Sequence, residues 1–144
     1  MKLSFSVDVP DSAMLREDVL EKARTVLWLS MHEMQTLAKR YAPVDVGLLR
    51  SSINLDPIAD GYDTYTLSVG VDYGVYVEYG SGPHTPPIEP LKGWSRRVLG
   101  DEALAYAVRA KIAKEGVDAQ PFIRPALNEV QKVHLPRIWA NVMS

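Results

Sequence analysis

The beginning of the chain changes from a strand pattern to a helix pattern. In KLSFSVDV, residues 2–9, apolar and polar side chains alternate, which predicts a strand with one buried face. From about residue 12 to Tyr41, apolar side chains recur every three or four positions, which predicts a long helix. Asp11 or Ser12 is suited to cap its start. Pro43 ends it, because the residue before a proline disfavours the helical conformation.

Two apolar lines run along this predicted helix. One face carries Val19, Ala23, Val26, Ser30, Met34, Leu37 and Tyr41. Beside it, Leu20, Leu27 and Met31 form the second line. A single wide stripe is typical of a helix that packs on a sheet, and the second line leaves room for contact with a neighbouring subunit.

A strand-rich region follows the helix. LLRSSINL, residues 48–55, predicts a short turn and then a strand, and YDTYTLSVGVD, residues 62–72, alternates as a half-buried strand does. Asp60 and Gly61 between them form a hairpin-turn signal. YGVYVEYG, residues 73–80, fits either a strand or a short helix, and its sequence leaves both open.

The second half of the chain opens with a loop rich in proline and glycine. Residues 80–90 predict a mobile loop. Two helices are expected next, over residues 91–99 and 101–116, and together they form a helical insertion at 91–116.

An extended connector and a last helix complete the chain. Residues 117–125 predict the connector, and Pro125 suits the first turn of a C-terminal helix that Pro136 kinks or interrupts. We therefore expect a single α+β domain over residues 1–144. A long N-terminal helix packs on a small, mainly antiparallel sheet, with additional C-terminal helices.

Composition narrows the classes of protein. The 144 residues carry a net charge of -2, so no global positive field is available to hold nucleic acid. The absence of cysteine excludes disulfides, thiolate catalysis and cysteine-ligated zinc. The first residues lack the apolar core of a signal peptide, and no apolar run approaches the ~20 residues that span a bilayer. We expect a soluble protein made in a cytoplasm.

Candidate chemistry is sparse. Glu78 and His84 could form an acid–base pair of a small hydrolase, yet no nucleophile with an oxyanion hole accompanies them. The three histidines lack metal-binding spacing, so we expect neither a metal nor another cofactor. WSRR at residues 94–97 puts an aromatic ring beside two cations, and with Arg109 and Lys111 it leaves a nucleic-acid-binding module open. A solvated helix face is the commoner explanation of such a stretch.

Candidate contact residues are mostly aromatic. Five of the seven tyrosines lie between Tyr62 and Tyr79. Tyrosine combines contact area with a polar tip and suits interfaces, although padding at the edges of a small sheet explains it equally well. The interface candidates are Tyr73, Tyr76, Tyr79, His84, Trp94, Arg96 and Arg97.

Three motifs occur in series along the chain. They are YAPVDVGLLRSSI at residues 41–53, VGVDYGVYVEYGSG at 69–82 and QPFIRPAL at 120–127. In this order they resemble the head–tail joining (neck) or minor tail component family of tailed bacteriophages, the gene-product-10-like family of lambdoid siphophages. The resemblance covers about residues 12–130. Val46 and Ser81 stand where threonine is usual in that family. The motif positions with an expected structural role are Pro43, Gly47, Arg50, Glu78, Gly80, Pro121, Phe122 and Pro125.

The resemblance implies a structural virion protein and no enzymatic activity. Such a protein would assemble as a homo-oligomeric ring, with a hexamer as the candidate stoichiometry, between the capsid connector and the tail. Its partners would be its own copies, head-closure or adaptor proteins and tail proteins, with no membrane and no specific nucleic acid. It would be made in the bacterial host cytoplasm and reside in the neck or tail of the virion. A tail terminator or tail-completion protein is the nearest alternative.

The junction at residues 40–53 has an expected structural role. Pro43 stops the helix and Gly47 supplies a backbone turn. Arg50 is then free to meet a carboxylate. We expect that carboxylate to be Glu78, because both residues belong to the matching motifs, so that their ion pair fixes the junction.

Overall fold

The structure, a computed structural model, describes residues 1–6, 17–57 and 64–144. Over these ranges the chain is α+β, as the sequence predicts. The described strands β1 (Lys2–Ser6), β2 (Ile53–Pro57) and β3 (Thr64–Val69) form an antiparallel sheet in the order β1-β3-β2. The predicted helix cap at Asp11 or Ser12 and the hairpin turn at Asp60 and Gly61 lie outside the described residues.

Helix α1 (Glu17–Tyr41) packs along this sheet. The middle of both predicted apolar lines is buried, including Met34 and Leu37 of the first and Met31 of the second. The ends of the first line differ from the prediction, since Val19 and Tyr41 are each 38% exposed. Both lines therefore serve the core of the same subunit over most of their length.

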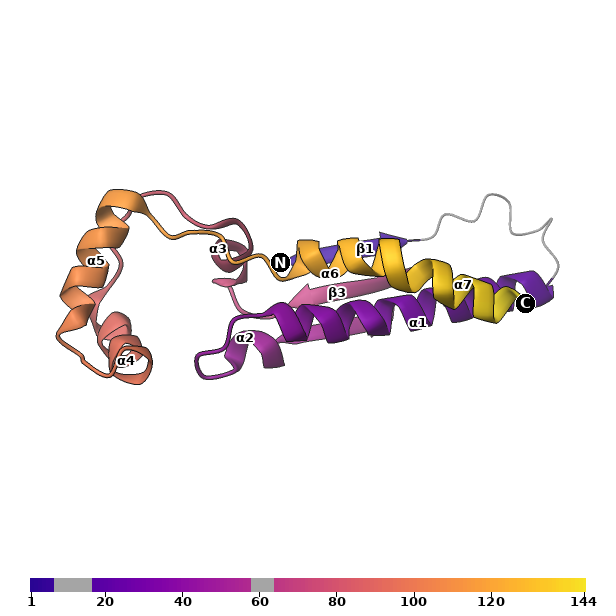
Figure 1. Cartoon of the computed structure of the whole chain (residues 1–144), viewed down its shortest axis with the longest axis horizontal. Helices are drawn as coiled ribbons and strands as arrows, with labels where there is room; N and C mark the ends of the chain where they lie inside the picture. The colour runs from indigo at the N-terminus through magenta and orange to yellow at the C-terminus, as the bar shows by residue number, and fades with distance from the viewer. Residues whose placement is uncertain (7–16, 58–63) are drawn as a thin grey trace.

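A second helical rod runs antiparallel to α1 on the same side of the sheet (Figure 1). It consists of α6 (Ile123–Glu129), a π-helical stretch η2 (Val130–His134) and α7 (Leu135–Met143). The interruption expected at Pro136 is confirmed, because this proline lies in the first turn of α7 directly after the π-helical stretch. A proline cannot donate to the carbonyl four positions earlier and its ring crowds that carbonyl, so regular α geometry is broken there.

The core lies between the sheet and the helical layer formed by α1 and the second rod. Its fully buried members include Leu37 from α1, Leu67 from β3 and Phe122 just before α6. The short helix α2 (Leu48–Ser51) follows the α1 junction and contributes Leu49 to the core. The undecided segment 73–80 is helical, as α3 (Gly74–Tyr79).

The predicted insertion forms a separate helical hairpin at one end of the long axis (Figure 1). It contains α4 (Ile88–Val98) and α5 (Leu104–Glu115), which pack on each other. Helix α4 begins at Ile88 and not at residue 91, so the Pro/Gly-rich loop ends at Pro87. Pro90 lies within the first helical turn, where a missing N–H costs nothing. None of the described core-cluster residues belongs to this hairpin.

Candidate functional site

A cleft of about 1070 Å³ lies between the hairpin and the rest of the molecule. Its walls come from the loop after α1, from α2 and α3, from the loop before α4, from α4 itself and from the connector after α5. The apolar side chains that line it, prolines aside, are Val44, Val46, Leu48, Leu49, Tyr73, Tyr76, Val77, Trp94, Val98 and Val117. All three sequence motifs contribute to these walls, so the cleft collects segments that are far apart in the chain.

Two antiparallel connectors join the hairpin to the body. Ser81 and Val117 exchange two backbone hydrogen bonds, each 2.9 Å long. The His84 N–H donates to the Ile112 carbonyl at 3.3 Å, and the Gln120 N–H donates to the Val77 carbonyl at 2.8 Å. These bonds hold the hairpin at a fixed place beside α3.

Glycine is required on both connectors. Gly80 and Gly116 have φ of 76° and 80° with ψ near 180°, a region that is essentially restricted to glycine. A Cβ on Gly116 would lie 2.1 Å from the Ser81 carbonyl oxygen, and one on Gly80 would lie 2.7 Å from the Val117 carbonyl oxygen. Each connector therefore leaves no room for a side chain on the other. The sequence predicts Gly116 only as a helix stop.

Glu78 is the anchor between the second and third motifs. Its side chain is 1% exposed. One carboxylate oxygen accepts from the N–H groups of Phe122 and Ile123, at 2.7 and 2.9 Å. The other accepts from the backbone N–H and the Nε of Arg124, at 3.0 and 3.1 Å. Glu78 thus caps the start of α6, where free N–H groups and the helix dipole favour a negative charge.

The expected ion pair between Arg50 and Glu78 is wrong. Arg50 is exposed on α2, and Glu78 pairs instead with Arg124, which also donates to the Glu78 carbonyl at 3.1 Å. The physical reason is that backbone N–H groups at a helix start satisfy a buried carboxylate better than one distant guanidinium could.

Asp45, which lines the cleft, pairs with Arg97 of α4. The Arg97 guanidinium donates two hydrogen bonds to the Asp45 carboxylate, at 2.9 and 2.5 Å. This bidentate pair joins the loop after α1 to α4. The hydrogen bonds from Arg97 hold the pKa of Asp45 below its usual value. Asp45 is part of the first motif, but no local signal names a partner 52 positions away.

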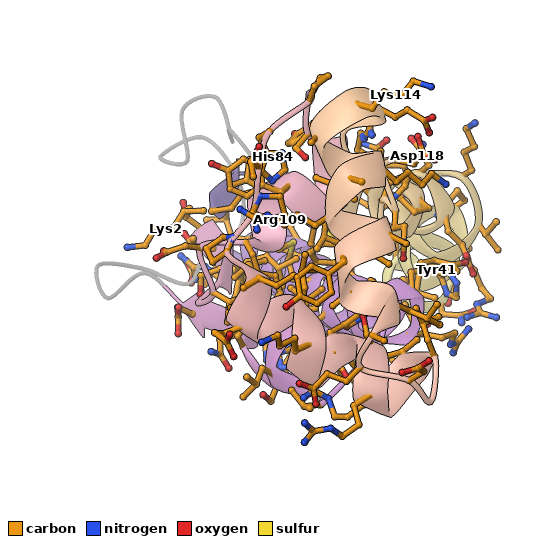
Figure 2. All side chains as sticks on the ribbon, turned by 90° about the vertical axis from the view of Figure 1, so that its left-hand side faces the viewer. Lys2, Tyr41, His84, Arg109, Lys114 and Asp118 are labelled. Atoms are coloured by element: carbon orange, nitrogen blue, oxygen red, sulfur yellow. The ribbon has the colours of Figure 1, made fainter. Side chains whose placement is uncertain are left out.

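The interface candidates divide into two groups. Tyr73, Tyr76, His84 and Trp94 line the cleft. Figure 2 looks along the long axis from the hairpin end and shows His84 and Asp118, another lining residue, on either side of α5.

The remaining candidates lie outside the cleft lining. Tyr79 is exposed and lies under the Arg124 guanidinium, whose central carbon is 5.1 Å from the ring centre. Arg96 pairs with Glu102 and Arg97 with Asp45, so both cations of the WSRR stretch already have acidic partners.

Glu78 and His84 do not form the acid–base pair that the sequence left open. Glu78 is fully occupied by the start of α6, and the His84 ring lies 2.9 Å from the Gly82 carbonyl and 3.5 Å from the Ser81 hydroxyl. No ion pair joins Glu78 to His84 among the described residues. In the same described part of the chain, no group of three or more histidine or acidic side chains is arranged to hold a metal ion.

A polar cluster ties α1 to the second helical rod, away from the cleft. The Tyr41 hydroxyl donates to the Glu129 carboxylate, and this hydrogen bond lowers the pKa of Glu129 and raises that of Tyr41. His134 lies 3.4 Å from carboxylate oxygens of both Glu33 and Glu129. The cluster fixes the register of the two helical layers.

Comparisons of the chain with protein-family models, with curated proteins and with solved structures found no significant match in any of the three. None of the described helices is both long enough and apolar enough to cross a bilayer.

Proposed function

We propose that this protein is a structural virion component of a tailed phage or prophage that joins head and tail. The motif resemblance points to this role. The observation that carries the proposal is that residues of all three motifs line one cleft, among them residues 43–49, Tyr76 and Gln120. Motif residues that meet at one largely apolar surface, with the buried Glu78 beside it capping α6, are what an assembly protein needs.

The cleft supports binding of protein rather than of a small molecule. Pockets for small ligands usually measure ~300–1,000 Å³ and present a few convergent polar groups. With a volume of about 1070 Å³ this cleft slightly exceeds that range, and valine, tyrosine and tryptophan side chains contribute much of its lining. Exposed apolar surface of this kind marks interaction sites in soluble proteins.

Gene deletion in the phage or prophage that carries this chain tests the proposal. We expect DNA-filled heads and separate tails in electron micrographs, with joining restored by the wild-type gene. Complementation with Tyr76→Asp should fail, because a charge enters the apolar cleft wall. Tyr106→Asp is the matched control, since Tyr106 on α5 is 58% exposed against 60% for Tyr76 and does not line the cleft.

The same micrographs distinguish the alternatives. Normal joined virions after deletion would refute a head–tail joining role. Tails of abnormal length, still unable to join, would instead support the tail terminator or tail-completion role.

A further inference from the structure

We propose that the cleft of one copy receives helix α7 of the next copy, in a head-to-tail contact. This inference rests on the proposed head–tail joining role, for which the motif resemblance implies a ring, and it names the partner of the cleft. Two surfaces in the described structure lack a sufficient partner: the cleft itself and the apolar side of α7.

Helix α7 is amphipathic but incompletely covered. Its apolar side chains follow the three-to-four spacing of a single helical stripe, which normally faces a core. They are Leu135, Ile138, Trp139, Val142 and Met143. Although α7 packs beside α1, none of its residues is buried, and Trp139 is 52% exposed. An exposed tryptophan on such a stripe is a typical anchor of a protein interface.

The two surfaces lie at different ends of the molecule. In Figure 1, α3 and α4, which line the cleft, lie towards one end of the long axis, and α7 lies at the other. A contact between two different surfaces of identical subunits is heterologous, and it forms a ring when the rotation between copies closes. A self-complementary two-fold contact would instead need one surface to meet itself.

Charge favours α7 as the occupant. From Val130 onward the chain has no acidic side chain, whereas it carries Lys132 and Arg137. Two aspartates line the cleft, of which Asp45 is already paired with Arg97 and Asp118 is left to attract a cation. Across the described residues, Asp118 has no basic partner and Arg137 has no acidic one, because the neighbour of Arg137 is His134 at 3.2 Å. Docking of α7 would supply each with an opposite charge.

Cysteine trapping tests the contact directly, because the chain has no native cysteine. Tyr76→Cys places a thiol in the cleft and Trp139→Cys places one on α7. When the two variants are mixed under mild oxidation at high protein concentration, we expect about tenfold more mixed dimer than with Tyr106→Cys in place of Tyr76→Cys, because docking raises the local thiol concentration. Equal yields from the two mixtures would overturn the proposal.

A chain that carries both Tyr76→Cys and Trp139→Cys tests the head-to-tail geometry. A heterologous contact should give a ladder of oligomers, whereas dimers alone would show a two-fold exchange and overturn it. Exchange of charges adds an independent check. Asp118→Lys in the Tyr76→Cys chain, or Arg137→Glu in the Trp139→Cys chain, should lower the trapping yield when present alone. When each chain carries its charge change, the yield should be restored.

The result separates this inference from the proposed function. A head–tail joining defect after gene deletion, combined with no specific trapping, would reject the α7 contact and leave the joining role standing. Specific trapping without any virion defect would support the α7 contact and reject the joining role. Occupation of the cleft by a different tail or head protein would appear as no enrichment in the mixture of the two cysteine variants.

Discussion

The carboxylate of Glu78 lies 2.7 Å from the backbone nitrogen of Phe122, although 44 positions separate the two residues. The Phe122 side chain is completely buried in the core, and Glu78 is 1% exposed beside it. A side chain from α3 therefore caps α6 without a capping residue in the α6 segment itself. This contact joins the cleft wall to the core, so the position of the cleft depends on it.

Replacement of Glu78 by glutamine should destabilise the fold. The amide would keep one acceptor oxygen but turn an NH₂ group towards the N–H and Nε of Arg124, which are also donors. We expect a loss of about 2 kcal/mol in the free energy of unfolding, because buried donors lose a charged acceptor. Denaturant titration measures this loss.

Glu115→Gln is the matched control for this change. Glu115 lies exposed at the end of α5, and its substitution should alter stability by less than about 0.5 kcal/mol. Equal stabilities of the Glu78→Gln and Glu115→Gln variants would contradict the capping role of Glu78.

Replacement of Gly116 by alanine should destabilise the fold more than the same change at a positive-φ glycine with open space around it. Gly100→Ala provides the comparison, since Gly100 also has a positive φ, of 79°, but nothing lies within 4 Å of its added Cβ. We expect Gly100→Ala to cost about 1 kcal/mol from strain alone. Gly116→Ala should cost about 3 kcal/mol or more, because the connectors must also part. Unfolding titrations of both variants measure the difference, and similar losses would refute the crowding argument.

Acidification should weaken the Asp45–Arg97 contact. The hydrogen bonds from Arg97 lower the pKa of Asp45 below the ordinary value of 3.8 in the folded protein. The contribution of this pair to stability is therefore fully present above pH 3.8 and is lost as the pH falls through the lowered pKa. A carboxyl-resolved NMR titration measures that pKa.

Arg97→Gln should bring the pKa of Asp45 back towards its ordinary value. Arg96→Gln is the matched control, because Arg96 donates to Glu102 and lowers the pKa of that residue instead. A shift of Asp45 in the Arg96 variant but not in the Arg97 variant would contradict the assigned pairing.

Removal of the Tyr41 hydroxyl should affect Glu129. Since the hydrogen bond from Tyr41 is the largest cause of the lowered Glu129 pKa, Tyr41→Phe should raise that pKa towards 4.5. The rise should stop short of 4.5, because His134 still lowers it. An unchanged Glu129 signal in an NMR titration would mean that this link between α1 and α6 is absent in solution.

Local patterns predicted the secondary structure well where one face of an element is buried. The alternation in β3 and the helical spacing of α1 are direct consequences of the sheet and helix periods. Segment 73–80 was undecided because its state depends on packing. A Cβ on Gly74 would lie 2.8 Å from Val69 Cγ1, so this glycine lets the start of α3 lie against the end of β3. No sequence pattern predicts this close contact between Gly74 and Val69.

The candidate site was less predictable than the fold, because its decisive partners are backbone atoms. Shared membership of the motifs favours Arg50 as the partner of Glu78, whereas in the structure the Glu78 carboxylate accepts hydrogen bonds from the N–H groups of residues 122–124. The cleft lining included four of the expected interface residues. The cleft exists because the Ser81–Val117 bridge holds the hairpin beside the body. No local sequence pattern predicts that bridge.

The paired hydrogen bonds between Ser81 and Val117 have a consequence for how such proteins diversify. The two ends of the α4–α5 segment meet at this bridge. The bridge therefore joins the two connectors whatever the length of the segment between them. The entropy cost of closing the α4–α5 segment into a loop grows only logarithmically with its length, by about 0.6 kcal/mol for each doubling. Recombination between related genes could therefore lengthen, shorten or replace the α4–α5 segment without changing the rest of the fold. Partner choice would then change from one lineage to another while the inherited scaffold stays the same.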